Sequence, residues 1–597
     1  MGIMKQTAIY NRVLTNISKL ITMNGAQLLA KALKDAGIKY LFGYNGGAIM
    51  PFYDELDKNH ELKHVMARNE QGATFMAQGL SRASISTSTP QIGCCLATSG
   101  PGATNLVTGV ADAMMDSIPI LSITGQVSTS VIGTDAFQET DVVGIMMPVT
   151  KQVYMPTSIN KIEETVHEAV YVASTGRPGP VHIDIPKNIQ QLECPRKYSF
   201  DYKNFSPDLP GYYYHPNPDS GKLMEAIHLI NRSKRPVIFS GHGVMLSNSG
   251  MELLEFADRI DAPIASTIHG VSAFPADHPR HLGWMGMHGT VEANRAIQHS
   301  DLIIAFGMRF DDRVTGKLEE YAKNADVIHI EIDPSEIDKN VKTSVAINAD
   351  VKEALEAFNS SNQLRANKHA DWFSQIAQFK AELGEWHAKE LEHGYGKEKK
   401  LLMKTVIQKL SDVTHGKDLI VTDVGQHQMI TAKYYNFLTT NSLFLSGGAG
   451  TMGCSLPMAI GVKFARPEET VWSISGDGGF QMNIQELGTV MEHNVDIKIV
   501  ILNNHFLGMV RQWQTLFFDG RYSGTPMLNP EYELIAQAYK IPYLKIETKE
   551  DIGPAFKKAR AHKGAFMLEF ECDPSEIVLP MVPSNSGFDN MIVNPKI

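Results

Sequence analysis

The sequence has few cysteines, and their spacing matches no familiar metal-binding or disulfide pattern. Only five cysteines occur in 597 residues, and no two of them form a C-x-x-C motif. A small, odd number of cysteines without this spacing indicates neither a disulfide-stabilised secreted fold nor a zinc site. We therefore expect a reduced, cytoplasmic protein.

Long apolar runs and clusters of positive charge are also missing. No uninterrupted apolar run reaches the roughly 18 residues of a membrane-spanning helix, so no membrane partner is expected. The net charge is −10 and the lysines and arginines form no basic cluster, which argues against nucleic acid because phosphate neutralisation needs grouped cations. With membranes and nucleic acids excluded as partners, we expect a protein that acts on small molecules.

The length predicts more than one hydrophobic core. A typical domain of about 150 residues predicts three or four domains in a chain of 597 residues. Residues 1–22 carry Lys5, Arg12 and Lys19 but no acidic residue, which resembles a transit peptide as much as a disordered leader. We favour a dispensable extension, because Met23 precedes a predicted helix as though it were an alternative start.

The most informative stretch is 470–504, where two apolar segments flank a glycine-rich turn. The first segment, Val471–Ser475, is typical of a buried parallel strand, and we expect Gly476–Gly479 to end it with unusual backbone angles. A helix is predicted for Asn483–Val490, and the β-branched segment Ile497–Leu502 predicts a second strand. The order is strand, turn, helix and strand.

Polar residues follow both of these strands. In a right-handed βαβ unit the two strands finish at one edge of the sheet, so Asp477 and Asn504 can share a cation. Such oxygen ligands suit Mg²⁺, which also takes diphosphate oxygens, and the following helix would direct its positive N-terminus at the phosphates. The alternative is an ordinary glycine turn with two loop asparagines. The spacing from G-D-G to Asn503-Asn504 nevertheless resembles the thiamin-diphosphate motif, in which the Asp and the second Asn hold the metal.

The N-terminal part of the chain also alternates between helix and strand patterns. Residues 25–37 predict an amphipathic helix closed by glycine, and Tyr40–Gly43 begins a strand. Glu70 follows another predicted strand, where a lone glutamate is usually an N-terminal helix partner. Three segments rich in small residues are each expected at a strand end, on the ligand-lined edge of a doubly wound sheet: 97–105, 123–126 and 133–139.

Together these segments resemble the acetolactate synthase (acetohydroxyacid synthase) family of thiamin-diphosphate-dependent enzymes, over about residues 23–580. The fragments that carry the resemblance are GGAIMPFYDEL, ATSGPGATNLVTG, GTDAFQE, RFDDRVTGK, TDVGQHQM, GTMG and GMVRQWQ. Two positions depart from it, because the family usually has proline where Asn45 lies and histidine where Asn69 lies. The resemblance implies an α/β fold with three doubly wound parallel-sheet domains.

The division of the chain combines this resemblance with local composition. The Pro- and Tyr-rich segment 194–220 has no clear periodicity, and 366–400 is helical but rather polar, so both are expected to connect domains. We predict an N-terminal extension at 1–22, a pyrimidine-binding domain at 23–190, a linker at 191–220, a central FAD-binding domain at 221–365, a connecting segment at 366–400, a diphosphate- and Mg-binding domain at 401–580 and a C-terminal tail at 581–597.

The resemblance implies a carboligase. Pyruvate would be decarboxylated on thiamin diphosphate, and the hydroxyethyl carbanion would attack a second 2-oxoacid, pyruvate or 2-oxobutyrate, in the first common step of isoleucine and valine biosynthesis. Other thiamin enzymes of the same fold are alternatives, among them pyruvate oxidase, 2-oxoacid decarboxylase and glyoxylate carboligase. Glu70 argues against the last of these, and Arg313 with Trp513 argues against simple decarboxylation. A catalytically silent paralogue is the alternative from another class.

Cofactor-binding residues are carried over by position. Glu70 matches the glutamate that hydrogen-bonds the pyrimidine ring, and Met452 matches the apolar residue that holds the cofactor bent; without the resemblance Met452 would be core filler. The expected catalytic residues are Glu70, Gly46, Gln138 and Lys187. The thiamin-diphosphate positions are Glu70, Asn105, Val424, Gly425, Gln426, His427, Gly450, Met452, Gly476, Asp477, Gly478, Gly479 and Asn504, and the metal positions are Asp477, Asn504 and Phe506.

Substrate-binding residues follow in the same way. Arg313 matches an arginine that binds the acceptor carboxylate with its planar guanidinium, the alternative being a surface salt bridge with Asp311 or Asp312. Trp513 would wall the acceptor pocket and favour the larger acceptor through apolar contact. The full set is Arg313, Trp513, Phe137, Met287, Met509 and Val510.

The central domain is expected to bind FAD, although the reaction is not a redox reaction. Asp333 ends the predicted strand 327–333 and is placed to bind a ribose or adenine, or alternatively to cap a helix at Pro334. The matching positions are Arg177, Gly241, Gly243, His288, Gly289, Thr290, Gly307, Arg309, Asp333 and Asp350.

The resemblance also implies an assembly. In the family, the glutamate of the first domain and the diphosphate site of the third belong to different chains, so we expect a homodimer with active sites shared between chains. A tetramer and a small regulatory subunit stay open.

Overall fold

The computed structural model describes residues 23–194, 199–212, 216–393 and 400–593. The extension predicted at 1–22, parts of the predicted linker and connecting segment, and the last four residues of the predicted tail lie outside them. In this part of the chain no helix is long and apolar enough to cross a membrane.

The chain divides into two compact units. The first holds the chain up to Ala77 together with Gln91–Ser174 and Pro178–Gly211. The second holds Tyr212–Ile597 together with two short segments, Gln78–Pro90 and Thr175–Arg177. One six-stranded sheet lies in the first unit, and two lie in the second.

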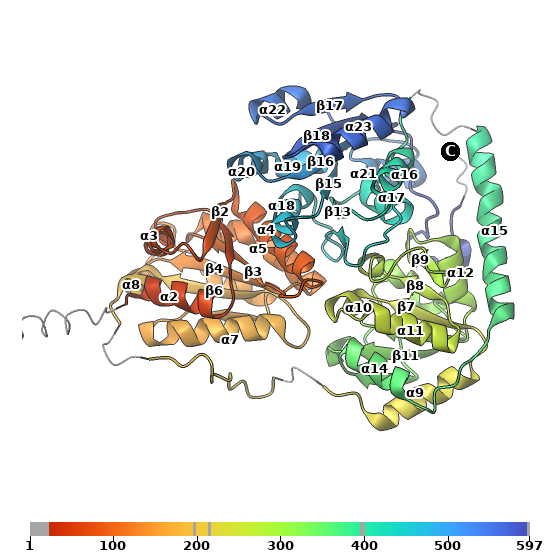
Figure 1. The fold of residues 1–597 in the computed structure, drawn as a ribbon, viewed down its shortest axis with the longest axis horizontal. Coiled ribbons are helices and arrows are strands. Elements are labelled where there is room, and N and C mark those ends of the chain that lie inside the picture. The colour runs from red at the N-terminus through yellow and green to blue at the C-terminus, as the bar shows by residue number, and fades with distance from the viewer. Residues whose placement is uncertain (1–22, 195–198, 213–215, 394–399, 594–597) are drawn as a thin grey trace, which may run out of the picture. The chain divides into compact units, whose positions relative to one another are not determined.

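All three sheets are six-stranded and fully parallel (Figure 1). The first sheet has the order β2-β1-β3-β4-β6-β5, and the third repeats it as β14-β13-β15-β16-β18-β17. The central sheet differs, since β9-β8-β7-β10-β11-β12 is the 3-2-1-4-5-6 order of dinucleotide-binding folds. The predicted fold of three doubly wound parallel sheets is confirmed.

The first sheet is built from strands that are apolar on both faces. Strand β3, with the sequence GCCLA, is buried at every residue, as expected for a parallel strand covered by helices on both sides. Its strands are β1 (Tyr40–Gly43), β2 (Lys63–Met66), β3 (Gly93–Ala97), β4 (Ile120–Gln126), β5 (Gln152–Tyr154) and β6 (Val181–Pro186). The helices are α2 (Gly25–Asp35), α3 (Met50–Lys58), α4 (Glu70–Ser84), α5 (Pro101–Asp116), α6 (Val142–Met146), α7 (Ile162–Ser174) and α8 (Lys187–Gln191).

The central sheet has its own core, in which aromatic side chains of several elements meet. Phe256, Phe306 and Phe358 are fully buried and pack edge to face or tilted against one another. The strands are β7 (Pro236–Ser240), β8 (Ile264–Ser266), β9 (His281–Trp284), β10 (Leu302–Phe306), β11 (Asp326–Glu331) and β12 (Val345–Asn348). The helices are α9 (Ser220–Arg232), α10 (His242–Leu246), α11 (Gly250–Ile260), α12 (Val291–His299), α13 (Asp312–Thr315), α14 (Val351–Ser360) and the long α15 (Ala370–His393), which runs beside α12 (Figure 1).

The part of the chain that forms the third sheet and its helices runs from α16 to β18. Its strands are β13 (Leu419–Thr422), β14 (Leu443–Phe444), β15 (Val471–Gly476), β16 (Ile497–Asn503), β17 (Tyr543–Ile546) and β18 (Phe566–Glu571). The helices are α16 (Met403–Thr414), α17 (Gln426–Tyr434), α18 (Ser455–Ala465), α19 (Asp477–Met482), α20 (Leu487–Glu492), α21 (Gly508–Phe517), α22 (Tyr532–Ala538) and α23 (Lys549–Ala561).

The backbone at Gly476–Gly479 corrects the first prediction for this stretch. Gly476 has φ −77°, and helix α19 starts directly after it, so these glycines have no unusual backbone angles. They are needed because neighbours lie too close for a side chain: a Cβ on Gly479 would lie 2.3 Å from Asp423 Oδ1, and one on Gly478 would lie 2.7 Å from Leu507.

Two further predictions about local structure are wrong. The helix expected at Asn483–Val490 is interrupted, because Asn483 leaves helical geometry and its side chain donates to Gly453 O at 2.7 Å. A 3₁₀ turn and α20 follow instead. Segment 133–139 does not follow a strand end either, since β4 ends at Gln126 and a 3₁₀ turn at Thr129–Val131 intervenes.

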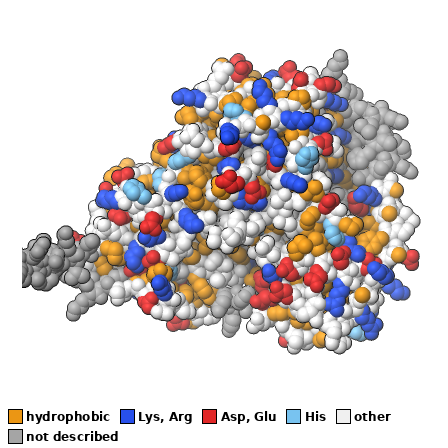
Figure 2. All heavy atoms as spheres, in the orientation of Figure 1, with side chains coloured by type: hydrophobic (Ala, Val, Ile, Leu, Met, Phe, Trp, Pro, Cys, Tyr) orange, Lys and Arg blue, Asp and Glu red, His pale blue; other side chains and the backbone are white. Residues whose placement is uncertain are grey.

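Exposed ion pairs show that charged side chains of both signs lie near one another on the surface, as for Lys58 with Asp54 and Arg521 with Asp519. On the face that Figure 2 shows, Lys and Arg side chains are scattered among Asp and Glu side chains. One ion pair with a buried carboxylate joins Arg560, on α23, to Asp418, directly before β13. Asp418 is buried, receives two bonds of 2.8 Å from Arg560 and accepts a third, at 3.0 Å, from the indole of the fully buried Trp472.

Replacement of Asp418 by alanine tests this contact. The variant leaves the Trp472 N–H buried without an acceptor, and it should lose about 2 kcal/mol of stability, measured as a lower midpoint of thermal unfolding. Asp412→Ala is the control, because this carboxylate is 69% exposed and only 3.5 Å from Lys409. Equal midpoints for the two variants would refute the assignment.

Candidate active site

The carboxyl ends of β13, β15 and β16 form one edge of the third sheet, at the point where the strand order reverses. Gly476, at the end of β15, pairs with Leu502, so Asp477, the first residue after β15, and Asn503, the last residue of β16, are neighbours at this edge. Ligands of doubly wound folds bind at such switch points. The structure therefore places the predicted metal residues where a ligand is expected.

Asp477 is a buried carboxylate held by a neutral partner. It is 1% exposed, and its Oδ2 accepts a bond of 2.8 Å from Asn529 Nδ2. Asn529 also donates to Asn503 Oδ1 at 2.8 Å and accepts from Gln481 at 2.9 Å, which fixes its amide. Burial raises the pKa of Asp477. A carboxylate in this setting is stabilised by a cation, and the oxygen donors present fit Mg²⁺.

The described residues contain no group of three or more His, Cys, Asp or Glu side chains that could hold a metal ion. A metal at Asp477 would therefore rely on amide or backbone oxygens and on oxygens of its ligand, as Mg²⁺ does when it binds a phosphate. Asn504 supplies such an amide. Its Oδ1 accepts from Phe506 N at 3.2 Å, and its Nδ2 lies 3.4 Å from Gln426 Oε1.

Helix α17 starts at the same edge and has no side chain as its N-terminal cap. Gly425 precedes it with φ 147°, a conformation that other residues rarely adopt. His427, in its first turn, is buried and has no partner for Nε2. Burial lowers the pKa of His427 to about 4, so its ring is neutral at pH 7. An unpaired ring nitrogen and free backbone N–H groups fit an anionic diphosphate.

Asp423 organises this edge, although the sequence did not mark it as a site residue. Its buried carboxylate accepts from the backbone N–H groups of Val424, at 2.9 Å, Gly453, at 2.9 Å, and Ser455, at 3.1 Å. Gly479 leaves room for it. One side chain thus fixes the turn before α17, the turn before α18 and the start of α19. An acid directly after a buried strand was the signal that could have indicated it.

The turn that Asp423 holds carries two predicted cofactor residues. Gly450 has φ 63°, which requires glycine at this point of the turn. The Met452 side chain lies against the start of α19, because a Cβ on Gly478 would be 3.6 Å from its Cε. This arrangement agrees with an apolar residue next to the diphosphate edge.

In the first unit, the predicted catalytic residues gather at the equivalent switch point, between β1 and β3. Glu70 is the first residue of α4, and its Oε2 accepts a bond of 2.9 Å from Asn105 Nδ2 on α5. A Cβ on Gly102 would lie 3.3 Å from Glu70 Oε1, so the glycine lets helix α5 approach the carboxylate. Gly46 lies against Thr98 in the same way.

The other first-unit residues surround this point. Gln138 has φ 60°, and its carbonyl lies against Gly100. Phe137 is 88% exposed, and Lys187 begins α8 directly after β6. The two departures from the family serve local roles: Asn45 Oδ1 accepts from Gly46 N at 2.7 Å, and Asn69 Oδ1 accepts from Gln71 N at 2.9 Å.

In the central sheet, three predicted glycines meet at the switch point between β7 and β10. Gly243 N donates to Gly307 O at 2.8 Å, and a Cβ on Gly241 would lie 2.2 Å from the same oxygen. Gly307 has φ 56°. The absence of side chains lets the two turns touch, which leaves backbone groups at the sheet edge, where dinucleotides bind in this strand order.

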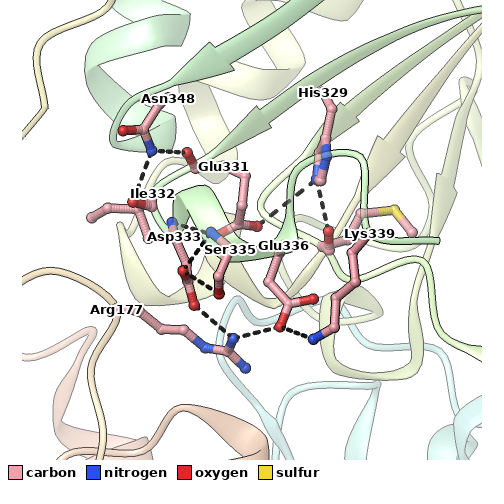
Figure 3. Close-up of polar contacts among 10 residues, drawn as sticks. Arg177, His329, Glu331, Ile332, Asp333, Ser335, Glu336, Lys339 and Asn348 are labelled. Atoms are coloured by element: carbon pink, nitrogen blue, oxygen red, sulfur yellow. Dashed lines mark hydrogen bonds and ion pairs between the residues drawn. The ribbon is translucent and has the colours of Figure 1, made fainter. Parts of the chain in front are cut away.

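Arg177 and Asp333 belong to an ionic cluster at the end of β11 (Figure 3). Arg177 Nη1 donates to Asp333 Oδ2 at 3.1 Å and to Glu336 Oε1 at 2.9 Å, and Lys339 also reaches Glu336. Asp333 caps the 3₁₀ turn Pro334–Glu336 by accepting from Ser335 N at 2.9 Å. The structure thus has the capping contact that was the alternative for Asp333.

The remaining residues predicted to bind FAD differ in their surroundings. Thr290 and Asp350 cap α12 and α14, and the nearest acid to Arg309 is Asp311, at 3.7 Å. His288, followed by Gly289, is buried; the backbone of Val578 and Pro580 lies near its ring without a well-formed hydrogen bond to either nitrogen, and burial lowers its pKa to about 3. A buried neutral ring with two unpaired nitrogens fits a polar ligand at this edge.

The predicted substrate residues are only partly brought together. Arg313 Nη1 lies 3.4 Å from Met287 Sδ, whereas its distance to Asp312 is 3.7 Å, so a tight salt bridge does not occupy the guanidinium. Met509, Val510 and Trp513 share helix α21, of which Gln512 is the buried residue. Its side chain bonds to Gln426 and to Val578 N.

Three family models match successive parts of the chain. The N-terminal TPP binding domain of thiamine pyrophosphate enzymes matches residues 23–145, their central domain matches 223–358, and their C-terminal TPP binding domain matches 423–570. The order of the three matches follows the three sheets.

Whole-length relatives give the same result. The acetolactate synthase large subunit of Haemophilus influenzae is 39% identical over 578 residues, which cover 96% of this chain and 98% of the relative. Acetolactate synthase 1, chloroplastic, of Oryza sativa subsp. japonica is 40% identical over 96% of this chain and 88% of its own length. The probable acetolactate synthase large subunit of Methanocaldococcus jannaschii is 40% identical over 96% and 97%. The chain therefore belongs to the thiamine pyrophosphate enzyme family, within which it is related along almost its whole length to acetolactate synthases.

Proposed function

We propose that this protein catalyses the acetolactate synthase reaction. Pyruvate loses carbon dioxide, and its remaining two-carbon unit is joined to a second 2-oxoacid, either pyruvate or 2-oxobutyrate. The observation that carries the proposal is the pair of equivalent switch points, one with Glu70 bonded to Asn105 and the other with the buried Asp477. The reaction would serve isoleucine and valine biosynthesis.

Residues of the third sheet would hold the cofactor and its metal. Asp477, the Asn504 side chain and the backbone at Phe506 offer oxygen ligands to Mg²⁺, and Val424–His427 at the start of α17 offer donors to a diphosphate. Gly476, Gly478 and Gly479 keep this edge open, while Gly450 and Met452 form the adjoining turn. Thiamin diphosphate, when bound, supplies the carbon centre that accepts and transfers the two-carbon unit.

Glu70 would govern proton movement at the other end of the cofactor. A carboxyl group at the pyrimidine ring can hold or release a proton there, and the bond from Asn105 fixes which oxygen faces the ring. Gly46, Gln138 and Lys187 lie on loops or helix starts at the same sheet edge and would contact the reacting groups.

The acceptor would be recognised by charge and by apolar contact. Arg313 is 56% exposed and offers its guanidinium to a carboxylate, and Met287 lies beside it. Trp513, Met509, Val510 and Phe137 would supply the apolar wall. A methylene more or less in such a pocket is worth about 1 to 3 kcal/mol, which bears on the choice between 2-oxobutyrate and pyruvate.

FAD binding by the central domain is part of the same proposal. The strand order, the glycine turns at Gly241–Gly243 and Gly307, and the unpaired nitrogens of His288 support a dinucleotide site. Arg177 and Asp333 would face its ribose or phosphate groups, provided that the ligand displaces part of the ionic cluster that joins them.

A homodimer with shared active sites is proposed as the working assembly. Support comes from exposed apolar side chains in the first unit, such as Phe137 at 88%, Met147 at 64% and Met50 at 52%. Two of the relatives named above are called large subunits, which supports a smaller partner chain for this protein as well.

Product analysis tests the proposal directly. Purified protein with pyruvate, thiamin diphosphate, Mg²⁺ and FAD should form acetolactate, and addition of 2-oxobutyrate should yield acetohydroxybutyrate. A pyruvate oxidase or decarboxylase on the same fold would release acetyl phosphate or acetaldehyde instead. Either product without acetolactate would replace our assignment by that second candidate.

Glu70→Gln tests the proton-transfer role. The amide keeps the shape and can still accept from Asn105, but it cannot exchange a proton, so turnover should fall by about 10²- to 10⁴-fold. Folding, followed by circular dichroism, should not change. Glu61→Gln provides the control, since this side chain is 69% exposed at the surface of the same unit. Normal turnover by Glu70→Gln would remove the residue from its assigned role.

Asp477→Asn tests the metal site without turnover. Loss of the carboxylate charge should weaken Mg²⁺-dependent binding of thiamin diphosphate by about 10- to 100-fold, measured by calorimetric titration across Mg²⁺ concentrations. The matched control is Asp519→Asn, whose carboxylate is 87% exposed beside Arg521. If both variants bind the cofactor as the native protein does, the metal lies elsewhere.

A further inference from the structure

The loop 127–140, between β4 and α6, carries Phe137 and Gln138 and has a strained backbone. Asp135 and Gln138 have φ values of 56° and 60°, the left-handed region that residues with a side chain seldom adopt. A Cβ on Gly100 would lie 2.9 Å from Gln138 O, so the loop also passes very close to the start of α5. A conformation of this kind persists only if other contacts impose it.

One such contact lies inside the loop. The carboxylate of Glu139 accepts from the backbone N–H groups of Gly133 and Ala136, the latter at 3.0 Å. Bonds from these backbone groups, that of Gly133 first, lower the pKa of Glu139. The Glu139 side chain therefore holds the tip of the loop in place through hydrogen bonds within the loop. This contact does not fix the loop to the sheet.

Gln126 fixes the loop to the sheet at both of its ends. It is the last residue of β4 and is buried. Its Oε1 accepts from Val127 N at 2.8 Å, and its Nε2 donates to Thr140 O at 3.0 Å and to Asp184 Oδ2 at 2.9 Å. The orientation of the amide is thereby determined, since an exchange of O and N would oppose two donors at Val127.

Asp184 is the partner that holds this amide. It lies on β6 opposite Thr124, is fully buried, and its Oδ1 accepts from the Thr124 hydroxyl at 2.6 Å. The described residues give it no cationic partner, and the nearby Asp141 adds repulsion; burial raises the pKa of Asp184 to about 6. Burying a carboxylate that has only two neutral donors costs desolvation free energy. An apolar pair of residues could join β4 to β6 without that cost, so Asp184 needs another explanation.

The neighbouring polar residues Ser122, His182 and Thr124 form a series of hydrogen bonds that ends at Asp184. Ser122 Oγ lies 3.0 Å from His182 Nδ1, and His182 Nε2 lies 2.9 Å from Thr124 Oγ1. Burial lowers the pKa of His182 to about 3, so the ring is neutral and carries one N–H. Because the Thr124 hydroxyl donates to Asp184, we assign that N–H to Nε2. This series of hydrogen bonds ends at Asp184, whose carboxylate accepts one hydrogen bond from Thr124 and another from Gln126.

We propose that Asp184 is a positioning residue that acts through Gln126 to hold the 127–140 loop, and with it Gln138 and Phe137, in the geometry that the reaction needs. The carboxylate supplies two acceptors at fixed places, and Gln126 passes this constraint to Val127 and Thr140. The kinetic part of the inference rests on the proposed function, because it assumes that Gln138 contacts reacting groups.

Asp184→Asn is the decisive variant. Asparagine has the same shape but one acceptor oxygen, so its NH₂ must face either the Gln126 amide N–H, which is a donor, or the Thr124 hydroxyl, whose proton must then turn away toward His182. We expect kcat/KM for pyruvate to fall about 10- to 100-fold, the range for loss of a buried bond to a charged group. The division of the loss between kcat and KM should match that of Gln138→Asn.

A double-variant cycle separates positioning from general stability. If Asp184 acts through the loop, Asp184→Asn combined with Gln138→Asn should lose clearly less activity than the sum of the two separate losses, because the second change removes part of what Asp184 positions and leaves only Phe137. Ser122→Ala is the matched control: it breaks the far end of the same hydrogen-bond chain without touching the loop. It should leave the kinetic constants unchanged. Additive losses in the double variant would overturn the proposal.

Hydrogen exchange gives a readout that needs no turnover. In Asp184→Asn, the amides of 127–140 should exchange at least about tenfold faster, while β4 and β6 keep native protection. Should this variant fail to fold, Gln126→Met removes the same bonds to the loop and leaves Asp184 with Thr124. Native exchange rates in the loop of a folded variant would refute the inference. Failure of the native protein to form acetolactate would refute the proposed function alone.

Discussion

The buried carboxylate of Asp423 is the interaction on which the third sheet's ligand edge depends. It lies after β13 and accepts backbone N–H groups from two turns, at Val424 and at Gly453 and Ser455. Turns of this kind have few contacts of their own and would otherwise be poorly fixed. Because Gly479 also packs against this carboxylate, the start of α19 and hence Asp477 are positioned by the same group.

Asp184 has a comparable role in the first sheet, although it meets side chains rather than backbone. Both residues are acids without a cationic partner among the described residues, and both lie close to a strand end that faces a predicted ligand. An acceptor-only group imposes direction on every donor around it, which an amide or a hydroxyl cannot do. At these two places a buried carboxylate orders a loop or a turn, at a cost in desolvation free energy.

Much of the fold could be predicted from the sequence, because parallel strands are short apolar runs. The strand expected to begin at Tyr40 does begin there, and Val471–Ser475 was one residue short. The placement of Asp477 beside the asparagines followed from the handedness of βαβ units. The handedness rule relates strands that are neighbours in a sheet, even when many residues separate them in the sequence.

The rest depended on contacts that no local pattern encodes. The glycines at 476–479 were expected to have unusual angles, yet they are required by the volume of Asp423 and Leu507, which reach them from distant turns. Ser122, Thr124 and His182 are ordinary strand residues in sequence, and their chain exists only because β4 and β6 are neighbours. Asp423 was overlooked for the same reason, since two of its three backbone donors lie some thirty residues later.

The glycines packed against carboxylates have a further consequence. In the first unit Gly102 lies against Glu70, and in the second Gly479 lies against Asp423, each within a helix, where glycine is unfavourable. A methyl group on Gly479 would lie 2.3 Å from Asp423 Oδ1, and one on Gly102 would lie 2.9 Å from Thr98 and 3.3 Å from Glu70 Oε1. The sheet edges where ligands are expected in the first and third sheets thus depend on missing side chains as well as on the groups that are present. This requirement restricts which residues the fold can accept at these positions.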